Sequence, residues 1–442
     1  MGEVEKSFRF SRGKFIIIQI FLIFLPIRIC SIRLVIIRAV SLVSLSLRIN
    51  KEIRWGLLQL AGIQLRLLTS FLLLLLVISF FHPRREKTYF GILTLIGLFL
   101  LISFRSINIL SFYIFFERAV LPVFLLILGW GYQPERLRAS LYILFYTLVT
   151  SLPLLVMIII ITRLYSANYD MLSFLKGSYT SPLILIILMA AFLVKFPVYG
   201  VHFWLPKAHV EAPVAGSMIL AGIMLKLGGY GLLLVYPLIS LGLATAAVRR
   251  LRLIGGSIIA VLILRVTDIK VIIAYSSVVH MAIIIAVMIG LRTIGVIGGI
   301  LIILAHGLTS SGIFRGVNIM YERSHTRRIL MNKGLLRSNA SFTIYWFLLI
   351  VINFSGPFTL NLLREIMIIQ SLINISYFYW SIVLILCFFS AAYNLVLYAS
   401  SQQGFSSSHS RVRRGFTSRE SLIIVAHSAP ILLLLLSLNL RL

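Results

Sequence analysis

The sequence predicts an all-α polytopic membrane protein with about 14 transmembrane helices. Of its 442 residues, 60% are hydrophobic and only 12% are charged, and the mean hydropathy is +1.04. Soluble domains are about 45–50% apolar and about 25% charged, and a soluble protein of this length could not bury so much apolar surface. β-strands are excluded because the apolar runs are long and continuous and lack the alternating pattern of a transmembrane barrel.

The apolar runs set the positions of the spans. A helix needs about 20 residues to cross a hydrocarbon core about 30 Å thick. On this rule we expect spans at residues 15–29, 31–47, 56–81, 89–104, 107–129, 139–162, 181–204, 212–236, 243–264, 270–290, 295–320, 340–372, 376–400 and 420–438. The first two are short and could be one kinked pair. The basic residues 1–14 resemble the start of a signal peptide, but no small-residue cleavage site follows, so we expect an uncleaved first helix.

Charge and motif content exclude several classes of protein. The formal net charge is +29, yet the 31 arginines and 10 lysines are scattered through apolar sequence, which argues against nucleic-acid binding. Cys30 and Cys387 are too few and too far apart for a disulfide framework or a zinc site. The sequence lacks a phosphate loop, a GxGxxG motif after a strand, HExxH and paired CxxC. We therefore expect no cofactor or metal in this chain.

The loop charges predict the orientation in the membrane. An even number of spans places both termini on one side, and the loops of the opposite side carry more basic residues. These are Arg84, Arg85, Lys87, Arg136, Arg138, Lys207, Arg323, Arg327, Arg328, Lys333, Arg411, Arg413 and Arg414. By the positive-inside rule this side faces the cytoplasm or matrix. The bias is modest, since the terminus side carries Lys6, Lys14, Lys51, Arg54, Arg249 and Arg250.

Four ionisable side chains inside the predicted spans give the strongest functional signal. They are Glu117, Lys195, Lys226 and Glu365. A charge at the centre of a membrane costs about 2.5–3.5 kcal/mol on insertion scales, so its presence indicates function by default. Burial favours the neutral form of a lysine and a nearby carboxylate favours the charged form, so a lysine whose carboxylate partner comes and goes can carry protons. A static structural ion pair is the alternative interpretation.

Two of these charges stand beside predicted helix breaks. Pro197 follows Lys195 by two residues, and the sequence Asn353-Phe-Ser-Gly-Pro357 precedes Glu365. Proline cannot continue the helical hydrogen bonds, and unpaired backbone at membrane depth is tolerated only inside protein or beside a hydrated cavity. The breaks fall five spans apart, which predicts two inverted five-helix repeats. We expect N-terminal helices at 1–88, a first repeat at 89–236, a second repeat at 237–400, and a C-terminal loop and helix at 401–442.

Histidines add candidate relay groups, because imidazole exchanges protons near neutral pH. His280 and His306 lie well inside predicted spans, and their occurrence with buried lysines favours a relay. Taken singly, each is equally compatible with a neutral, hydrogen-bonded packing role. His202 and His209 lie in the polar turn that follows Lys195, where a structural role fits as well.

Several motifs closely resemble one protein family. They are KFPVYGVHFWLPKAHVEAPVAGSMILAGIMLKLGGYG at 195–231, FYIFFE at 112–117, LGWGYQPERL at 128–137, SLYILFYTLVTSLPLL at 140–155, RVTDIKVIIAYSSVVHM at 265–281, LAHGLTSSGIF at 304–314, YERSHTRR at 321–328 and NLLREI at 361–366. The family is that of subunit 4 of mitochondrial NADH dehydrogenase (ubiquinone), an antiporter-like, proton-pumping subunit of respiratory complex I. The resemblance runs from about residue 90 to the end of the chain, and residues 1–80 match only in hydropathy.

The resemblance implies roles, partners and a location. The roles in proton transfer are a glutamate–lysine pair of Glu117 and Lys195, a central Lys226, a hydrated route lined by His280 and His306, and an acid toward the outer exit, Glu365. NADH, FMN, iron–sulfur clusters and ubiquinone would bind partner subunits, so this chain would hold no redox centre. Its partners would be neighbouring antiporter-like subunits of complex I and lipid such as cardiolipin. The location would be the mitochondrial inner membrane, with both termini on the intermembrane-space side.

The arginine content departs from the family. Arg38, Arg66, Arg118, Arg315 and Arg364 fall inside predicted spans, and at the last three the family usually carries a small or weakly polar residue. Animal-like mitochondrial codes read AGA and AGG as serine or glycine and AUA as methionine, where other codes read arginine and isoleucine. One interpretation is therefore that these arginines result from translation with a different code. The other is that they are real and pair with acids or extend to the membrane interface.

Three functions are compatible with the sequence alone. The first is a proton-pumping subunit of complex I, the second a subunit of a cation/proton antiporter of the same ancestry, and the third a passive membrane scaffold whose charges only hold helices together. The string LPKAHVEAPVAGSMILAGIMLKLGGYG and the expected lack of a soluble domain favour the first.

Overall fold

The computed structural model describes residues 61–72 except 63 and 67, 87–164 except 107, 182–235, 243–290, 292–405 and 415–439. Within these ranges every regular element is helical, and the backbone pairs only in an isolated β-bridge between Asp268 and Arg328. The predicted all-α class is confirmed for this part of the chain. The predicted spans at 15–29 and 31–47, and most of the span at 56–81, lie outside the described residues.

The helices follow the predicted spans closely. They are α4 (Lys87–Ser103), α5 (Ile109–Arg118), α6 (Val120–Trp130), α7 (Arg136–Leu164), α9 (Pro182–Lys195), α10 (Trp204–Glu211), α11 (Val214–Ile219), the π-helix η1 (Leu220–Met224), α12 (Leu225–Val235), α13 (Leu243–Ile263), α14 (Ile269–Met288), α15 (Thr293–Ser324), the 3₁₀-helix η3 (Ile329–Met331), α16 (Leu335–Ser338), α17 (Ala340–Asn353), α18 (Leu360–Ile373), α19 (Phe378–Gln402) and α20 (Ser418–Asn439). Six helical stretches of the described residues are long and apolar enough to cross a membrane.

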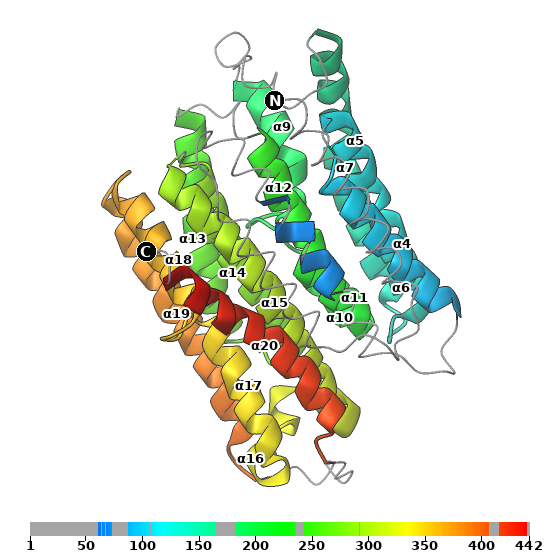
Figure 1. Ribbon diagram of the computed structural model, residues 1–442, viewed down its shortest axis with the longest axis vertical. Coiled ribbons are helices and arrows are strands. Elements are labelled where there is room, and N and C mark those ends of the chain that lie inside the picture. The colour runs from blue at the N-terminus through cyan, green and yellow to red at the C-terminus, as the bar shows by residue number, and fades with distance from the viewer. Residues whose placement is uncertain are drawn as a thin grey trace, which may run out of the picture.

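The bundle has an interior helix and peripheral ones. Figure 1 shows α4 to α7 at one side, α17 to α20 at the other, and α12, α14 and α15 between them. The apolar window of 214–235 is 100% buried, whereas that of 136–163 is only 28% buried. α7 therefore presents most of its surface outward, and the helix that carries Lys226 is enclosed by protein.

Glycines allow the interior helix to pack closely. A Cβ atom at Gly228 would lie 2.9 Å from the Phe192 carbonyl oxygen, and one at Gly231 would lie 2.2 Å from Phe192 Cδ1. Small residues at such positions let helices in a membrane approach backbone to backbone. The LGGYG sequence thus brings α12, the helix of Lys226, against α9, the helix of Lys195.

Both predicted helix breaks are confirmed. α9 ends at Lys195 and α10 begins at Trp204, nine residues later, with Pro197 in the turn between them. α17 ends at Asn353 and α18 begins at Leu360, and Ser355 in this break has a positive φ of 63°. The sequence did not predict the π-helical turn of 220–224, which directly precedes α12.

Candidate functional site

Glu117 and Lys195 form a close ion pair, as predicted. Lys195 Nζ lies 3.1 Å from Glu117 Oε1, and the exposed fractions of the two side chains are 5% and 16%. Lys195 Nζ also donates to the Phe116 carbonyl oxygen at 2.9 Å and lies 3.0 Å from the centre of the Phe116 ring. The last turn of α5 therefore supplies a carboxylate, a carbonyl and an aromatic face to one ammonium group.

Lys226 is wholly enclosed and lies just beyond the π-helical turn. Its exposed fraction is 0%, and its ammonium donates to the carbonyl oxygen of Ala221, which belongs to that turn. Among the described residues no carboxylate forms an ion pair with Lys226. π-Turns inside α-helices often occur at functional sites. The lysine is thus held by backbone rather than by a counter-charge.

His280 and His306 face each other from α14 and α15. Their ring centroids lie 5.1 Å apart at an interplanar angle of 44°, and both side chains are buried. The Nε2 atom of each ring makes no hydrogen bond with the residues that the structure describes. Electrostatic interactions connect both rings with Lys226 and Arg364. The pair therefore lies within electrostatic range of the central lysine.

Glu365 lies near the second helix break. Its Oε1 accepts a hydrogen bond from the Ser355 hydroxyl in that break. The neighbouring Arg364 is buried and donates from Nη1 to the Leu301 carbonyl oxygen at 3.1 Å. No hydrogen bond within the described ranges connects Glu365 directly with the histidine pair.

Three further ionisable groups gather where α10 ends, and the sequence did not single them out together. His209 is fully buried and stacks on Phe314 at 4.6 Å between centroids, and neither of its ring nitrogens has a hydrogen-bond partner within the described chain. Glu211 and Lys270 are buried beside it, and Lys270 Nζ lies 3.4 Å from the carbonyl oxygens of Val210 and Ala212.

Burial governs the protonation of the two groups between the predicted spans. Burial, reinforced by the charges of Lys270 and Lys226, lowers the pKa of His209 to about 3. Burial also raises the pKa of the Glu211 carboxyl. His209 is therefore neutral near pH 7. It lies within electrostatic range of both Lys270 and Lys226. His202, the other histidine of this segment, is buried and stacks on Phe203 at 4.5 Å, which fits a packing role.

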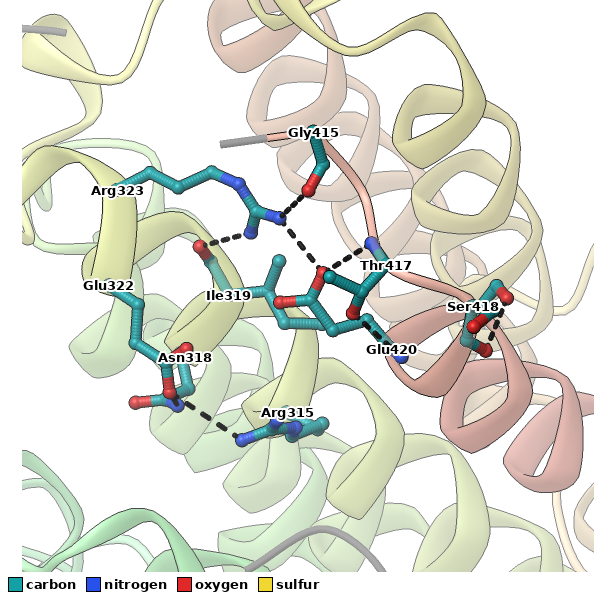
Figure 2. A network of polar contacts seen from close by, with 10 residues as sticks. Arg315, Asn318, Ile319, Glu322, Arg323, Gly415, Thr417, Ser418 and Glu420 are labelled. Atoms are coloured by element: carbon teal, nitrogen blue, oxygen red, sulfur yellow. Dashed lines mark hydrogen bonds and ion pairs between the residues drawn. The ribbon is translucent and has the colours of Figure 1, made fainter. Parts of the chain in front are cut away.

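A separate polar network ties α15 to α20 (Figure 2). Arg323 Nη2 lies 2.9 Å from Glu420 Oε2, and Arg323 also donates to the Ile319 and Gly415 carbonyl oxygens at 2.8 and 3.3 Å. The Thr417 backbone N–H donates to the same Glu420 oxygen at 2.9 Å, at the start of α20. This network includes none of the buried lysines, and it holds α20 against α15.

Comparison with known proteins decides the family. The family described as NADH:quinone oxidoreductase/Mrp antiporter, TM, matches residues 106–391. The chain is 47% identical over 350 residues to NADH-ubiquinone oxidoreductase chain 4 of Ceratitis capitata, and the match covers 78% of each chain. It is 46% identical over 330 residues to chain 4 of Aedes aegypti, with 74% of each chain covered. The chain belongs to the NADH-ubiquinone oxidoreductase chain 4 family.

Solved structures share the fold of this chain 4 family member. A chain of respiratory complex I from Thermus thermophilus with bound NADH superposes with a TM-score of 0.73 at 22% identity, covering 87% of this chain and 80% of that one. A chain of the membrane-bound sulfane sulfur reductase, an archaeal respiratory membrane complex, gives a TM-score of 0.75 at 15% identity, covering 92% and 93%. At these identities the likeness concerns the fold. It agrees with a multi-pass helical membrane subunit.

The chemistry that the described residues offer is proton transfer. Their His, Cys, Asp and Glu side chains form no group of three or more that could hold a metal ion. What they do form is a set of buried acids, lysines and imidazoles. The sequence named six of these groups, and it missed the joint position of His209, Glu211 and Lys270 because packing of α10 against α14 creates it.

Proposed function

We propose that this chain is a core membrane subunit of proton-translocating NADH:ubiquinone oxidoreductase and conducts protons through its buried Glu, Lys and His groups. Membership of the chain 4 family supports the assembly, and the enclosed Glu117–Lys195 pair carries the mechanism. NADH oxidation and ubiquinone reduction take place on partner subunits that bind NADH, FMN, iron–sulfur clusters and ubiquinone. This chain is therefore the translocating part of an enzyme whose redox chemistry happens elsewhere.

The Glu117–Lys195 pair acts as the switch. At an exposed fraction of 5% for Lys195, solvent screens the pair little, so the charge of Glu117 strongly affects the ammonium. When the carboxylate is near and ionised, the ammonium is stabilised. When the carboxylate is protonated or moves away, the neutral amine is favoured and the proton passes to the next group.

Lys226 and the histidine pair continue the route. Lys226 has no counter-charge within the described chain and hydrogen-bonds only to backbone, so a proton held there remains mobile. The facing rings of His280 and His306 offer an unpaired Nε2 each. Because no direct hydrogen bond joins these groups, water molecules complete the connections. Glu365, with Ser355 as its hydrogen-bond partner, receives the proton near the outer exit.

The group of His209, Glu211 and Lys270 serves proton uptake. Glu211 has a buried oxygen atom, Oε2, with no hydrogen-bond partner among the described residues. Both ring nitrogens of His209 are also buried and have no hydrogen-bond partner among those residues. His209 lies in electrostatic range of Lys270 on one side and Lys226 on the other. In this proposal a proton from Glu211 moves toward the central lysine through the neutral imidazole, which accepts at one ring nitrogen and donates from the other.

The architecture and setting follow from the same proposal. The chain has about 14 spans, with N-terminal helices at 1–88, inverted repeats at 89–236 and 237–400, and a last helix within 401–442. It lies in the mitochondrial inner membrane with both termini on the intermembrane-space side. It contacts neighbouring antiporter-like subunits of complex I and lipid such as cardiolipin. The two helix breaks, one in each proposed repeat, support this division.

Lys226→Ala tests the proposed function directly. The variant complex is expected to assemble and oxidise NADH, and to pump fewer protons per NADH oxidised, measured in sealed vesicles by a pH-sensitive dye. Lys207→Ala is the matched control, because Lys207 is exposed and lies 4.0 Å over the ring of Tyr142 outside the line of buried groups.

The outcomes separate the three candidate functions. Assembly with lost pumping supports a proton channel. Failed assembly of the Lys226→Ala variant, together with full pumping by a Lys226→Arg variant, supports a scaffold. Arginine keeps the positive charge but does not release its proton. Cation-dependent proton exchange by the chain without NADH oxidation supports an antiporter.

A further inference from the structure

An open cavity of about 450 Å³ lies where the break after α9 meets α13 and α14. The turn of 196–203 contributes Tyr199 and Phe203 to its wall, α13 contributes Ile259 and Leu262, and α14 contributes Tyr275. The exposed fractions of Tyr199, Phe203 and Leu262 are 45%, 51% and 49%. In a multi-pass membrane protein such outward-facing apolar side chains mark a surface that contacts lipid or another protein, and the cavity is a recess in this outer surface.

One end of the cavity carries a positive charge. Arg265 lines it and follows the last residue of α13 by two positions. The Arg265 backbone N–H bonds to the Leu262 carbonyl oxygen at 3.1 Å. Its side chain is exposed and forms no ion pair, hydrogen bond or ring contact within the ranges that the structure describes. The guanidinium is therefore available to an outside anion.

The depth of Arg265 corresponds to that of lipid headgroups. α14, which follows Arg265, is long and apolar enough to cross a membrane, and at about 1.5 Å per residue its 20 residues span about 30 Å, close to the thickness of the hydrocarbon core. Arg265 lies four residues before the start of α14, whereas Tyr275 of the cavity wall lies more than one turn inside that helix. The cavity thus runs from the level of headgroups into the level of acyl chains.

We propose that this cavity binds an anionic phospholipid, with the phosphate on Arg265 and one acyl chain between the turn of 196–203 and α13. A guanidinium matches the geometry of a phosphate through paired hydrogen bonds, and the aromatic and aliphatic wall matches a hydrocarbon chain. The bound chain braces the turn of 196–203, which directly follows Lys195. This inference rests on the membrane location and the lipid partner of the proposed function, for which it supplies a site, and it is independent of the proposed proton route.

The experiment uses the assembled complex in phosphatidylcholine vesicles doped with phosphatidylglycerol that carries a photoactivatable group on an acyl chain. After illumination, labelled peptides are mapped by mass spectrometry, and a photoactivatable phosphatidylcholine gives the comparison. Arg265→Gln removes the charge, and Leu262→Trp fills the cavity. Arg250→Gln is the matched control, an exposed arginine of α13 that does not line the cavity. Rates of NADH oxidation verify assembly.

Peptides that contain 196–203 and 255–266 are expected to be labelled more strongly by phosphatidylglycerol than by phosphatidylcholine. Arg265→Gln abolishes this preference, Leu262→Trp lowers labelling by both lipids severalfold, and Arg250→Gln changes neither. Excess unlabelled phosphatidylglycerol displaces the label from the unmodified complex, which tests the site even if a variant does not assemble. Equal labelling by both lipids, failure of this competition, or crosslinks from these peptides to a neighbouring subunit would overturn the proposal.

Discussion

Glu117 and Lys195 are 78 residues apart in the sequence, yet they form an ion pair. Oε1 of Glu117, in the last turn of α5, lies 3.1 Å from Nζ of Lys195, the last residue of α9. The contact joins an acid and a base that are both largely removed from solvent. Its strength therefore depends on the protonation and position of the carboxylate rather than on the surrounding water.

Glu117→Gln is expected to slow NADH-driven proton pumping and to leave NADH binding unchanged. The amide keeps the size of the side chain and removes the charge that stabilises the ammonium. A hydrogen bond to a charged group is worth about 1.5–3 kcal/mol, which corresponds to a reduction in pumping of about tenfold or more if proton uptake by Lys195 limits the rate. Proton release into the vesicle lumen and NADH oxidation are measured together. Glu135→Gln, at an exposed carboxylate, is the control, and full pumping by Glu117→Gln would falsify the switch.

Ser355→Gly is expected to slow pumping through loss of the hydroxyl that donates to Glu365. Glycine tolerates the φ of 63° at this position better than serine does, so the helix break keeps its shape. Ser355→Ala removes the same hydroxyl and retains the strain of a side chain at positive φ. Both variants should therefore pump equally slowly, and the Ser355→Gly complex should have the higher thermal stability of the two. Normal pumping by Ser355→Gly would show that the hydroxyl takes no part.

Gly231→Ala is expected to destabilise the chain by about 1–3 kcal/mol or more, because the added Cβ would lie 2.2 Å from Phe192 Cδ1. The helices α9 and α12 would have to separate, and the Glu117–Lys195 contact would loosen with them. Gly129→Ala is a matched change in α6, since nothing lies within 4 Å of a Cβ there. The amount of assembled complex on native gels and its melting temperature measure the difference. Equal stability of the two variants would contradict the close approach.

The Arg323–Glu420 pair is expected to contribute to the docking of α20 on α15. Both side chains are only 12–13% exposed and the two atoms lie 2.9 Å apart, so solvent weakens the pair less than it weakens a surface salt bridge. In a double-mutant cycle of Arg323→Met and Glu420→Gln, a coupling of about 1–3 kcal/mol in the stability of the complex is expected. Additive effects of the two changes would show that the pair contributes nothing beyond its separate contacts.

Residue 364 is expected to be serine or glycine in the protein isolated from its source. As arginine it is 2% exposed, its Nε has no hydrogen-bond partner among the described residues, and it places a fixed positive charge near His280 and His306. An unpaired guanidinium atom in a buried site is costly. Peptide masses that cover position 364 decide the matter, and positions 118 and 315 can be read in the same spectrum. Masses that match arginine at all three would show that the cations belong to the protein.

Hydropathy and proline predicted the fold well because both act locally. The spans from 89–104 onward correspond to helices, and Pro197 and Pro357 stand in the breaks that the sequence indicated. Local patterns carry no information on an insertion such as the π-turn of 220–224, whose sequence LAGIM is an ordinary helical one. That turn depends on how α11 and α12 pack against the rest of the bundle.

The candidate site was predictable to the extent that a charge in an apolar run is unusual by itself. Glu117, Lys195 and Lys226 stand out in this way, and the structure brings the first two into contact. Glu211 and Lys270 do not stand out, because each lies at the end of a helix, where charged residues are common. Only the packing of α10 on α14 buries them together with His209.

The end of α9 at Lys195 has an electrostatic consequence of its own. A helix carries about half a negative charge at its carboxyl end, where the last carbonyl groups lack partners. Because α9 stops at Lys195, this partial charge lies at the root of the lysine side chain. Glu117 therefore does not create the preference for a cation at this point but adds to one that the backbone already supplies. In the proposed mechanism, the interrupted helix holds the resting proton, and the carboxylate adjusts how tightly it is held.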